Sequence, residues 1–376
     1  MKIIYTIAGF YRPAGMERIL CDKANYLAAR GYELLIVTTE QKGRPDVFPL
    51  EEGIRREDLG IGYEDDNGAS FFTKLVHHPG KKRRHEKKLK ELLIREKADI
   101  VVSMFCGDET FLPAIKDGSK KVLEVHFSRF KRLQYGRKGF WAAADRFRSK
   151  REGRAAGRFD RFVALTGEDL GYWGNPGRGV AIPNFISEMP SGPSPLSEKV
   201  VLAVGRFTFQ KAFDRLIDIW AEVCRRLPDD NGWKLRLVGG GEDLDKMQEQ
   251  VRRLSLEDSV VFTSFSDDMP AIYRGASVFA LTSRYEGLPM VLLEAQAYGL
   301  PAVAYDCKCG PKDVICDGRN GFLVGEGDGE TFAQRLLQLI ENDTLRREMG
   351  AASREDASRW DKDKIMGQWI ELFRNI

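Results

Sequence analysis

Strands and amphipathic helices alternate along nearly the whole chain, and this alternation constrains the fold more than any other feature of the sequence. Residues 2–8 form an apolar run typical of a buried strand, and residues 16–30 place apolar side chains on one helical face before Gly31. Such alternation predicts parallel sheets covered by helices, as in doubly wound α/β domains. Further strands are expected near residues 33–38, 99–103, 121–126 and 160–165, and the alternation resumes from 199 to about 342.

A proline-rich stretch divides the chain in two. Its 376 residues suffice for two domains with separate cores, and residues 183–195 contain four prolines. The sequence therefore predicts a first domain over residues 1–183, a hinge over 184–198 and a second domain over 199–360. Residues 361–376 carry apolar side chains at helical spacing and are expected to form a last helix.

The composition is that of an ordinary globular protein, with 43% apolar and 31% charged residues. No run approaches the roughly 18 apolar residues that span a bilayer. The apolar segment at residues 1–9 is too short for a signal peptide. Six scattered cysteines suit a reducing cytosol. Cys307, Cys309 and Cys316 offer one sulfur too few for a closed zinc site.

Two carboxylates, Glu286 and Glu294, flank the start of a predicted helix that begins at Pro289. The first backbone N–H groups of a helix are free, and its dipole adds partial positive charge there, so this end attracts an anion such as a phosphate. The two carboxylates would then hold hydroxyl-bearing groups on either side of a diphosphate, as in a sugar nucleotide. Two ordinary solvated glutamates are the alternative.

Two cations follow a predicted buried strand about 80 residues upstream. The apolar run from Val200 ends at Gly205, and Arg206 and Lys211 lie in the loop that follows. Open α/β sheets bind ligands at the carboxyl ends of their strands, where Arg can fork onto two phosphate oxygens and Lys adds a point charge. Pairing with nearby acids is the alternative. Glycines 239–241 follow the next strand and form either a turn or a close approach to a base or ribose.

Together with the N-terminal Ala14-Gly15-Met16-Glu17, these motifs resemble the family-4 retaining glycosyltransferases of the GT-B fold. The resemblance covers nearly the whole chain. It implies two Rossmann-like doubly wound domains facing across a cleft, with the C-terminal helix crossing back to the first. It also implies transfer of a sugar from a nucleoside diphosphate sugar to a hydroxyl of a glycan or lipid-linked acceptor, with retained configuration, in cell-surface polysaccharide assembly.

The resemblance also implies residue roles. Arg206 and Lys211 would neutralise the donor diphosphate, Glu286 would hold the transferred sugar, Glu294 would bind the ribose, and His126 would lie near the sugar. A lone histidine is more often structural. No metal, cofactor or general base is assigned, because the cations and the helix end stabilise the leaving diphosphate. The remaining donor-binding positions are expected to be Gly15, Asn184, Gly205, Gly240, Phe265, Gly287, Leu288, Pro289, Met290 and Val291.

The donor and the loops are less sharply defined. The run from Tyr305 to Ile315 is similar to a subgroup that uses UDP-linked hexose or N-acetylhexosamine donors. The chain departs from the family pattern at Pro13-Ala14, where the family has a glycine, and in the spacing from Gly205 to Lys211.

Positive charge is concentrated in the first half of the chain. Residues 1–199 carry 36 basic and 27 acidic side chains, although the whole chain has a net charge of only +3. Residues 74–97 and 129–158 hold most of the excess, and the second segment also contains several aromatic residues. This pattern suits an anionic membrane surface or a polyprenyl diphosphate, so we expect a peripheral protein on the inner face of a membrane. A solvated helix face is the alternative, and no nucleic-acid-binding motif is present.

Other classes of protein remain as alternatives. A sugar-nucleotide epimerase of GT-B-like architecture would bind the same donor, as would a noncatalytic membrane-associated nucleotide-sugar-binding module. A dinucleotide oxidoreductase is disfavoured, because the loop from Gly9 to Gly15 lacks the required glycine pattern.

Overall fold

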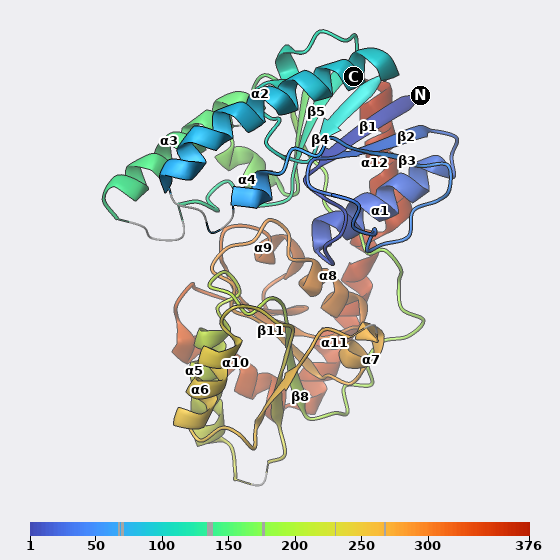
Figure 1. The fold of residues 1–376 in the computed structure, drawn as a ribbon. Helices are drawn as coiled ribbons and strands as arrows, with labels where there is room; N and C mark the ends of the chain where they lie inside the picture. The colour runs from blue at the N-terminus through green and yellow to red at the C-terminus, as the bar shows by residue number, and fades with distance from the viewer. Residues whose placement is uncertain (67, 69–70, 134–137, 175–176, 230, 267) are drawn as a thin grey trace. The chain divides into compact units, whose positions relative to one another are not determined.

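The computed structural model describes residues 1–66, 68, 71–133, 138–174, 177–229, 231–266 and 268–376. The chain forms two compact units (Figure 1). The first comprises Met1–Pro183 together with Asp363–Ile376, and the second comprises Asn184–Lys362. Each unit is built on its own parallel β-sheet, as the alternation of strands and helices predicts.

The sheet of the first unit has the strand order β3-β2-β1-β4-β5-β6-β7, and every pair of neighbours is parallel. The chain order reverses between β1 and β4, which makes the carboxyl ends of these two strands the expected ligand-binding point. The strands are β1 (Lys2–Ile7), β2 (Glu33–Thr38), β3 (Arg55–Asp58), β4 (Ile100–Ser103), β5 (Lys120–Val125), β6 (Arg161–Ala164) and β7 (Gly179–Ala181).

Helices connect these strands, and the last helix of the chain belongs to the same unit. Gly31 has a φ of 81° just beyond the first helix, a conformation that favours glycine. Within the basic segment 129–158, α3 covers Phe140–Ala156. The helices are α1 (Gly15–Ala28), η1 (Tyr63–Asp66), α2 (Phe71–Glu96), η2 (Leu112–Ala114), α3 (Phe140–Ala156), α4 (Gly167–Tyr172) and α12 (Lys362–Arg374).

The sheet of the second unit has the order β10-β9-β8-β11-β12-β13 and is also parallel throughout. It repeats the topology of the first sheet, with the reversal between β8 and β11. Its strands are β8 (Val200–Val204), β9 (Lys234–Val238), β10 (Val260–Thr263), β11 (Val278–Leu281), β12 (Ala302–Tyr305) and β13 (Gly321–Val324). Its helices are α5 (Phe213–Arg226), α6 (Leu244–Arg253), α7 (Met269–Arg274), α8 (Met290–Ala297), α9 (Pro311–Val314), α10 (Gly329–Glu341), α11 (Asp343–Asp356) and η3 (Ala357–Trp360).

Each unit has its own apolar core on its sheet, because parallel sheets are covered on both faces. Strand residues of the first core include Ile4, Leu35, Val101, Leu123 and Phe162. Those of the second include Val201, Leu235, Val278, Val303 and Phe322. Among the described residues, no helix combines the length and the apolar character needed to cross a membrane.

The proline-rich segment 184–198, where the sequence predicts a hinge, is counted within the second unit. The Ile186 N–H donates to the carbonyl oxygen of Trp360 at 2.9 Å, and the Ser194 hydroxyl donates to that of Ala276 at 2.6 Å. The Ile186 N–H and the Ser194 hydroxyl therefore bind this proline-rich segment to the rest of the second unit.

Candidate functional site

The candidate site of the second unit lies where its strand order reverses. β8 and β11 are adjacent, so the loop after β8, which contains Arg206 and Lys211, meets the loop after β11, which leads to Glu286. A backbone hydrogen bond joins the two loops, from the Arg284 N–H to the Gln210 carbonyl oxygen at 2.8 Å. Segments more than 70 residues apart in the sequence thus form one site.

Lys211 and Glu286 form a mostly buried ion pair at the centre of this site. The Lys211 Nζ lies 2.6 Å from the Glu286 Oε1, and their side chains are only 14% and 6% exposed. A lysine ammonium has three donors, so this contact leaves others for a ligand. The neighbouring Gln210 Nε2 donates to the Tyr285 carbonyl oxygen at 3.1 Å, which steadies the loop. The alternative that Lys211 pairs with a nearby acid is therefore realised, but with the candidate carboxylate itself.

The glycines of the site have different tasks. A Cβ on Gly239 would lie 1.9 Å from the Gly205 carbonyl oxygen, and one on Gly241 would lie 2.5 Å from that of Phe207. Their φ angles of 149° and 155° also favour glycine. These two residues thus let the loop after β9 pack against the loop after β8. Gly240 differs, because a Cβ there would meet nothing within 4 Å, so its backbone is open to a ligand.

Arg206 and Phe265 lie at the exposed rim of this unit. Within the described parts of the chain, no hydrogen bond or ion pair engages Arg206, whose side chain is exposed. The guanidinium is therefore available to an anion. Phe265 is 54% exposed, and its ring lies 3.6 Å from the position of a Cβ on Gly239. An exposed aromatic ring beside Gly239, next in sequence to the open backbone of Gly240, suits a planar base.

Helix α8 begins at Met290, one residue later than the sequence analysis expects, and Pro289 is its N-cap. Pro289 has a ψ of 102°, outside the helical range, and its carbonyl oxygen accepts the Leu292 N–H at 2.9 Å. As the first helical residues, Met290 and Val291 have no intrahelical acceptor for their N–H groups. The predicted helix start is thus present one residue later, and anion binding there stays a prediction.

Residues around α8 are fixed by packing. Gly287, Leu288 and Pro289 are buried, and the Pro289 ring would lie 2.7 Å from a Cβ on Gly310. The Glu294 Oε2 accepts a hydrogen bond from the Tyr273 hydroxyl at 2.6 Å. The hydrogen bond from Tyr273 to Glu294 was not predicted from the sequence, because no motif marks Tyr273.

Two expected residues, Gly15 and His126, belong to the first unit. Gly15 opens α1, with Ala14 as its N-cap. The His126 Nε2 lies 2.7 Å from the Glu124 Oε1, and the Lys23 Nζ lies 2.7 Å from the other carboxylate oxygen. His126 is thus part of a buried network that the sequence analysis missed. Asn184, by contrast, is a buried residue at the start of the second unit.

The network around Glu124 is electrostatically strong. Lys23 is 1% exposed and its Nζ lies 3.3 Å from the centre of the Trp369 ring on α12. Burial by itself would raise the pKa of Glu124, but Lys23 and then His126 outweigh it and hold the pKa at about 2. Glu124 is therefore an ionised carboxylate at neutral pH, which holds the imidazole of His126 in place.

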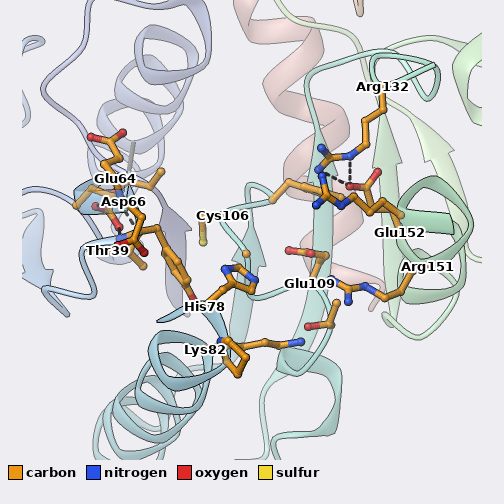
Figure 2. Close-up of a pocket in the computed structure, with 18 of the residues that line it drawn as sticks. Thr39, Glu64, Asp66, His78, Lys82, Cys106, Glu109, Arg132, Arg151 and Glu152 are labelled. Carbon is orange, nitrogen blue, oxygen red and sulfur yellow. Dashed lines mark hydrogen bonds and ion pairs between the residues drawn. The ribbon is translucent and has the colours of Figure 1, made fainter. Parts of the chain in front are cut away.

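The first unit also contains a cavity of about 920 Å³ (Figure 2). Its lining includes Ala8 after β1 and, after β4, Phe105, Cys106, Gly107, Glu109 and Thr110, so it coincides with the reversal point of the first sheet. Residues of α2 and α3 complete it, including Lys82 and Arg151. The two basic segments are visible in the sequence, but the cavity between them is not.

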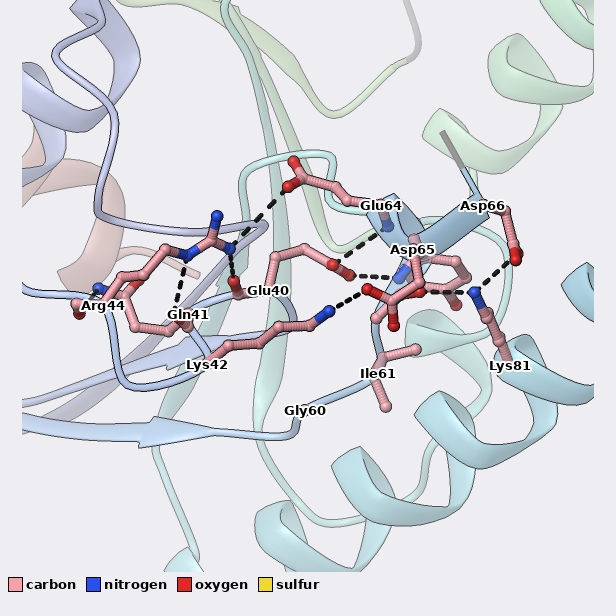
Figure 3. A network of polar contacts seen from close by, with 12 residues as sticks. Glu40, Gln41, Lys42, Arg44, Gly60, Ile61, Glu64, Asp65, Asp66 and Lys81 are labelled. Atoms are coloured by element: carbon pink, nitrogen blue, oxygen red, sulfur yellow. Dashed lines mark hydrogen bonds and ion pairs between the residues drawn. The ribbon is translucent and has the colours of Figure 1, made fainter. Parts of the chain in front are cut away.

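Glu40, Glu64 and Asp66 of the lining belong to a polar network, which Figure 3 shows. The Glu40 carboxylate accepts the backbone N–H groups of Tyr63 and Glu64 at 2.7 and 3.2 Å. The Lys81 Nζ donates to Asp66 Oδ2 and to the Gly62 carbonyl oxygen, both at 2.6 Å. These contacts fix η1 between β2 and α2. In the described ranges, no group of three or more His, Cys, Asp or Glu side chains is placed to hold a metal ion.

Comparisons with known proteins identify the family of the chain. The model of glycosyltransferase family 4 matches residues 13–187, and that of glycosyl transferases group 1 matches residues 185–356. An amylovoran biosynthesis glycosyltransferase of Erwinia amylovora, AmsD, is 42% identical over 172 residues, 46% of this chain and 47% of the relative. The match thus spans about half the length of that relative.

Two other similar proteins match over their full lengths. An uncharacterized glycosyltransferase of Haemophilus influenzae is 27% identical over 381 residues, covering 98% of both chains. The crystal structure of Anabaena HepE in complex with UDP superposes with a TM-score of 0.75 at 19% identity, covering 100% of both chains. With its two Rossmann-like units and family matches over both, the chain belongs to the family-4 glycosyltransferases of the GT-B fold.

Proposed function

We propose that this protein transfers a hexose or N-acetylhexosamine from its UDP-linked form to a hydroxyl of a glycan or lipid-linked acceptor in surface-polysaccharide assembly, with retention of configuration. The observation that carries the proposal is the Lys211–Glu286 ion pair at the strand reversal of the second unit. At this point the Glu286 carboxylate, which can accept hydrogen bonds from sugar hydroxyls, lies beside the Lys211 ammonium, which can bind a diphosphate.

The reaction requires stabilisation of the negative charge that develops on the leaving diphosphate. Lys211 and the exposed Arg206 would supply the cations, and the N–H groups of Met290 and Val291 would supply the helix end. Because these groups are held before the substrate arrives, they cost little reorganisation in the transition state. Glu294, fixed by Tyr273, would bind the ribose. We infer that no metal or cofactor takes part and that a donor phosphate oxygen accepts the acceptor's proton.

The names of similar proteins support the substrate class. AmsD is named for amylovoran biosynthesis, and the HepE structure contains UDP. These two facts describe AmsD and HepE, and they favour a uridine nucleotide as donor and a surface glycan as product for this chain. His126 and Gly15 would contribute from the first unit, His126 near the sugar and Gly15 at the distal phosphate.

Calorimetry with UDP, GDP and NAD tests the donor assignment. We expect UDP to bind, GDP to bind more weakly and NAD to give no signal. Glu294→Gln should weaken UDP binding by about tenfold, since a hydrogen bond to a charged group contributes roughly 1.5–3 kcal/mol. Glu341→Gln, at the exposed end of α10, is the matched control and should bind as the unchanged protein does. Equal affinities for UDP and NAD would contradict the assignment.

An epimerase would bind the same donor, so product analysis separates the two functions. A transferase forms a new glycoside only when an acceptor is present, whereas an epimerase changes the donor sugar alone. Mass spectrometry and proton NMR of donor incubated with and without a panel of lipid-linked acceptors distinguish these outcomes. A binding module without activity would leave the donor unchanged in both.

We further propose that the basic segments 74–97 and 129–158 adsorb to anionic membranes from the cytoplasmic side. Exposed cations on these helices include Arg83, Lys90, Arg146 and Lys150. Each cation near the surface would contribute about 1 kcal/mol. In flotation assays, binding to vesicles with anionic lipids should be clear at low salt and lost at high salt. Equal flotation with neutral vesicles, or none at low salt, would refute the proposal.

A further inference from the structure

A buried ion pair lies behind His126 in the first unit, and the reaction as proposed so far does not use it. Lys23 of α1 and Glu124 of β5 are each 1% exposed. The Lys23 Nζ lies 2.8 and 2.7 Å from the two carboxylate oxygens of Glu124. Apolar residues in place of such a pair often leave a protein as stable or more stable, so stability does not explain why both charges are buried here.

Aromatic rings hold the Lys23 ammonium in place. Its Nζ lies 3.3 Å from the centre of the Trp369 ring of α12 and 5.5 Å from that of the Tyr5 ring of β1. Both rings are buried, and a cation–π contact contributes more when it is shielded from water. Rings from α12 and β1 therefore fix the ammonium, and the ammonium fixes the Glu124 carboxylate.

The His126 imidazole contacts the same carboxylate. Its Nε2 lies 2.7 Å from the Glu124 Oε1, and the His126 side chain is 6% exposed. Burial would raise the pKa of Glu124, but Lys23 and His126 hold it at about 2, so this carboxyl group is ionised at neutral pH. An ionised carboxylate only accepts hydrogen bonds, so the imidazole proton lies on Nε2. Such a contact fixes both the tautomer and the orientation of a histidine ring.

The other ring nitrogen, Nδ1, is available to a substrate. Among the residues that the structure describes, no hydrogen bond or ion pair engages it. In the neutral ring, a proton on Nε2 leaves the lone pair on Nδ1, which makes this atom a hydrogen-bond acceptor. His126 directly follows β5, so it lies at the carboxyl edge of the first sheet, where α/β sheets bind ligands.

We propose that Glu124 and Lys23 are positioning residues for the transfer reaction, which act through His126. Lys23 fixes the carboxylate, the carboxylate accepts the Nε2 proton in a hydrogen bond, and Nδ1 accepts a hydrogen bond from a hydroxyl of the transferred sugar. The inference rests on the proposed function, because it takes from that function the contact between His126 and the sugar.

Kinetics of the double variant Lys23→Met with Glu124→Leu test the inference. The two changes remove the partner of the imidazole without leaving a buried charge, so the protein should remain folded. Turnover at saturating donor and acceptor should still fall by about tenfold to a hundredfold, because a group that contacts the substrate is no longer held in position. Turnover equal to that of the unchanged protein would reduce the pair to a structural role and overturn the inference.

The same strand offers a matched control at its other end. Lys121 of β5 pairs with Asp117, and their side chains are 4% and 0% exposed. Lys121→Met with Asp117→Leu removes a buried ion pair of the same type near the amino end of β5, away from the edge that carries His126. Its turnover should stay within about twofold of that of the unchanged protein. An equal fall in both double variants would reduce the effect to lost packing and overturn the inference.

Nitrogen NMR reports the state of the ring directly, including in the unchanged protein. The chain has four histidines, so protein with labelled imidazoles gives few signals, and the spectrum of His126→Ala identifies those of His126. At about pH 8 the His126 proton should lie on Nε2, and the Lys23→Met with Glu124→Leu variant should show a mixture of the two tautomers. A proton on Nδ1 in the unchanged protein, or identical His126 signals in both proteins, would overturn the inference.

Two further measurements separate this inference from the proposed function. UDP affinity should be unchanged in the Lys23→Met with Glu124→Leu variant, because neither residue belongs to the second unit. A loss of UDP affinity parallel to the loss of turnover would overturn the inference. Unchanged turnover of His126→Ala would overturn the sugar contact of the proposed function, whereas a fall in His126→Ala with none in the double variant would overturn the positioning role alone.

Discussion

Replacing Lys211 or Arg206 with alanine should lower the turnover of glycosyl transfer by at least two orders of magnitude. Loss of one preorganised donor to a developing oxyanion typically costs roughly 3–4 kcal/mol, which is a factor of about 10²–10³ in rate. The effect of Lys211→Ala should be the larger, because it also leaves the Glu286 carboxylate buried without its cation. The measurement is the rate of UDP release with saturating donor and acceptor.

Two comparisons make this prediction specific. Lys211→Ala combined with Glu286→Gln should recover stability but not turnover, since the buried charge is removed while the phosphate contact stays lost. Arg225→Ala, on the exposed face of α5, removes a cation that pairs with Glu222 and should leave turnover unchanged. Turnover within threefold of the unchanged protein for both site variants would remove Lys211 and Arg206 from the phosphate site.

Glu124→Ala should destabilise the first unit by roughly 3–5 kcal/mol, because it leaves the Lys23 ammonium buried without a counter-charge. Differential scanning calorimetry should show a fall of about 10 °C in the transition of the first unit, with that of the second unit as an internal reference. The double variant Lys23→Met with Glu124→Leu should recover more than half of the loss, as apolar replacements of buried ion pairs often do. Equal loss in single and double variants would contradict the role of the ion pair.

The same carboxylate gives the stability a pH dependence. The pKa of Glu124 in the folded chain is about 2, below the ordinary value, because Lys23 and His126 outweigh the effect of burial. A lowered pKa contributes stability that is present above the ordinary pKa and lost as the pH falls toward 2. The Glu124→Gln variant should lack this part of the acid sensitivity.

Much of the fold could be predicted because apolar periodicity decides it. The strands at 33–38, 99–103 and 160–165 lie within a residue of their predicted bounds, since β-branched runs that are buried on both faces allow no other position. β3 was missed, because its sequence Arg-Arg-Glu-Asp has no apolar pattern and it forms the edge of its sheet. An edge strand can be held by backbone hydrogen bonds alone.

The site was predictable as a set of loops but not as a set of contacts. Glycine and cations after an apolar strand mark a ligand-binding loop, so Gly205, Arg206 and Lys211 could be singled out. That Lys211 pairs with Glu286, 75 residues away, depends on how β8 and β11 pack, which no local pattern records. His126 could be named but not its partners, because Lys23 looks like any other helix lysine in the sequence.

The position of Trp369 over Lys23 also has a consequence for biosynthesis. Trp369 follows the whole second unit, Asn184–Lys362, in the chain, so it is synthesised only after that unit. A nascent first unit would therefore hold an incompletely covered ammonium until Trp369 has been synthesised. Expression of residues 1–183 alone should yield a poorly folded fragment. Addition of a peptide of residues 362–376 should restore folding, because the peptide supplies the Trp369 ring that covers Lys23.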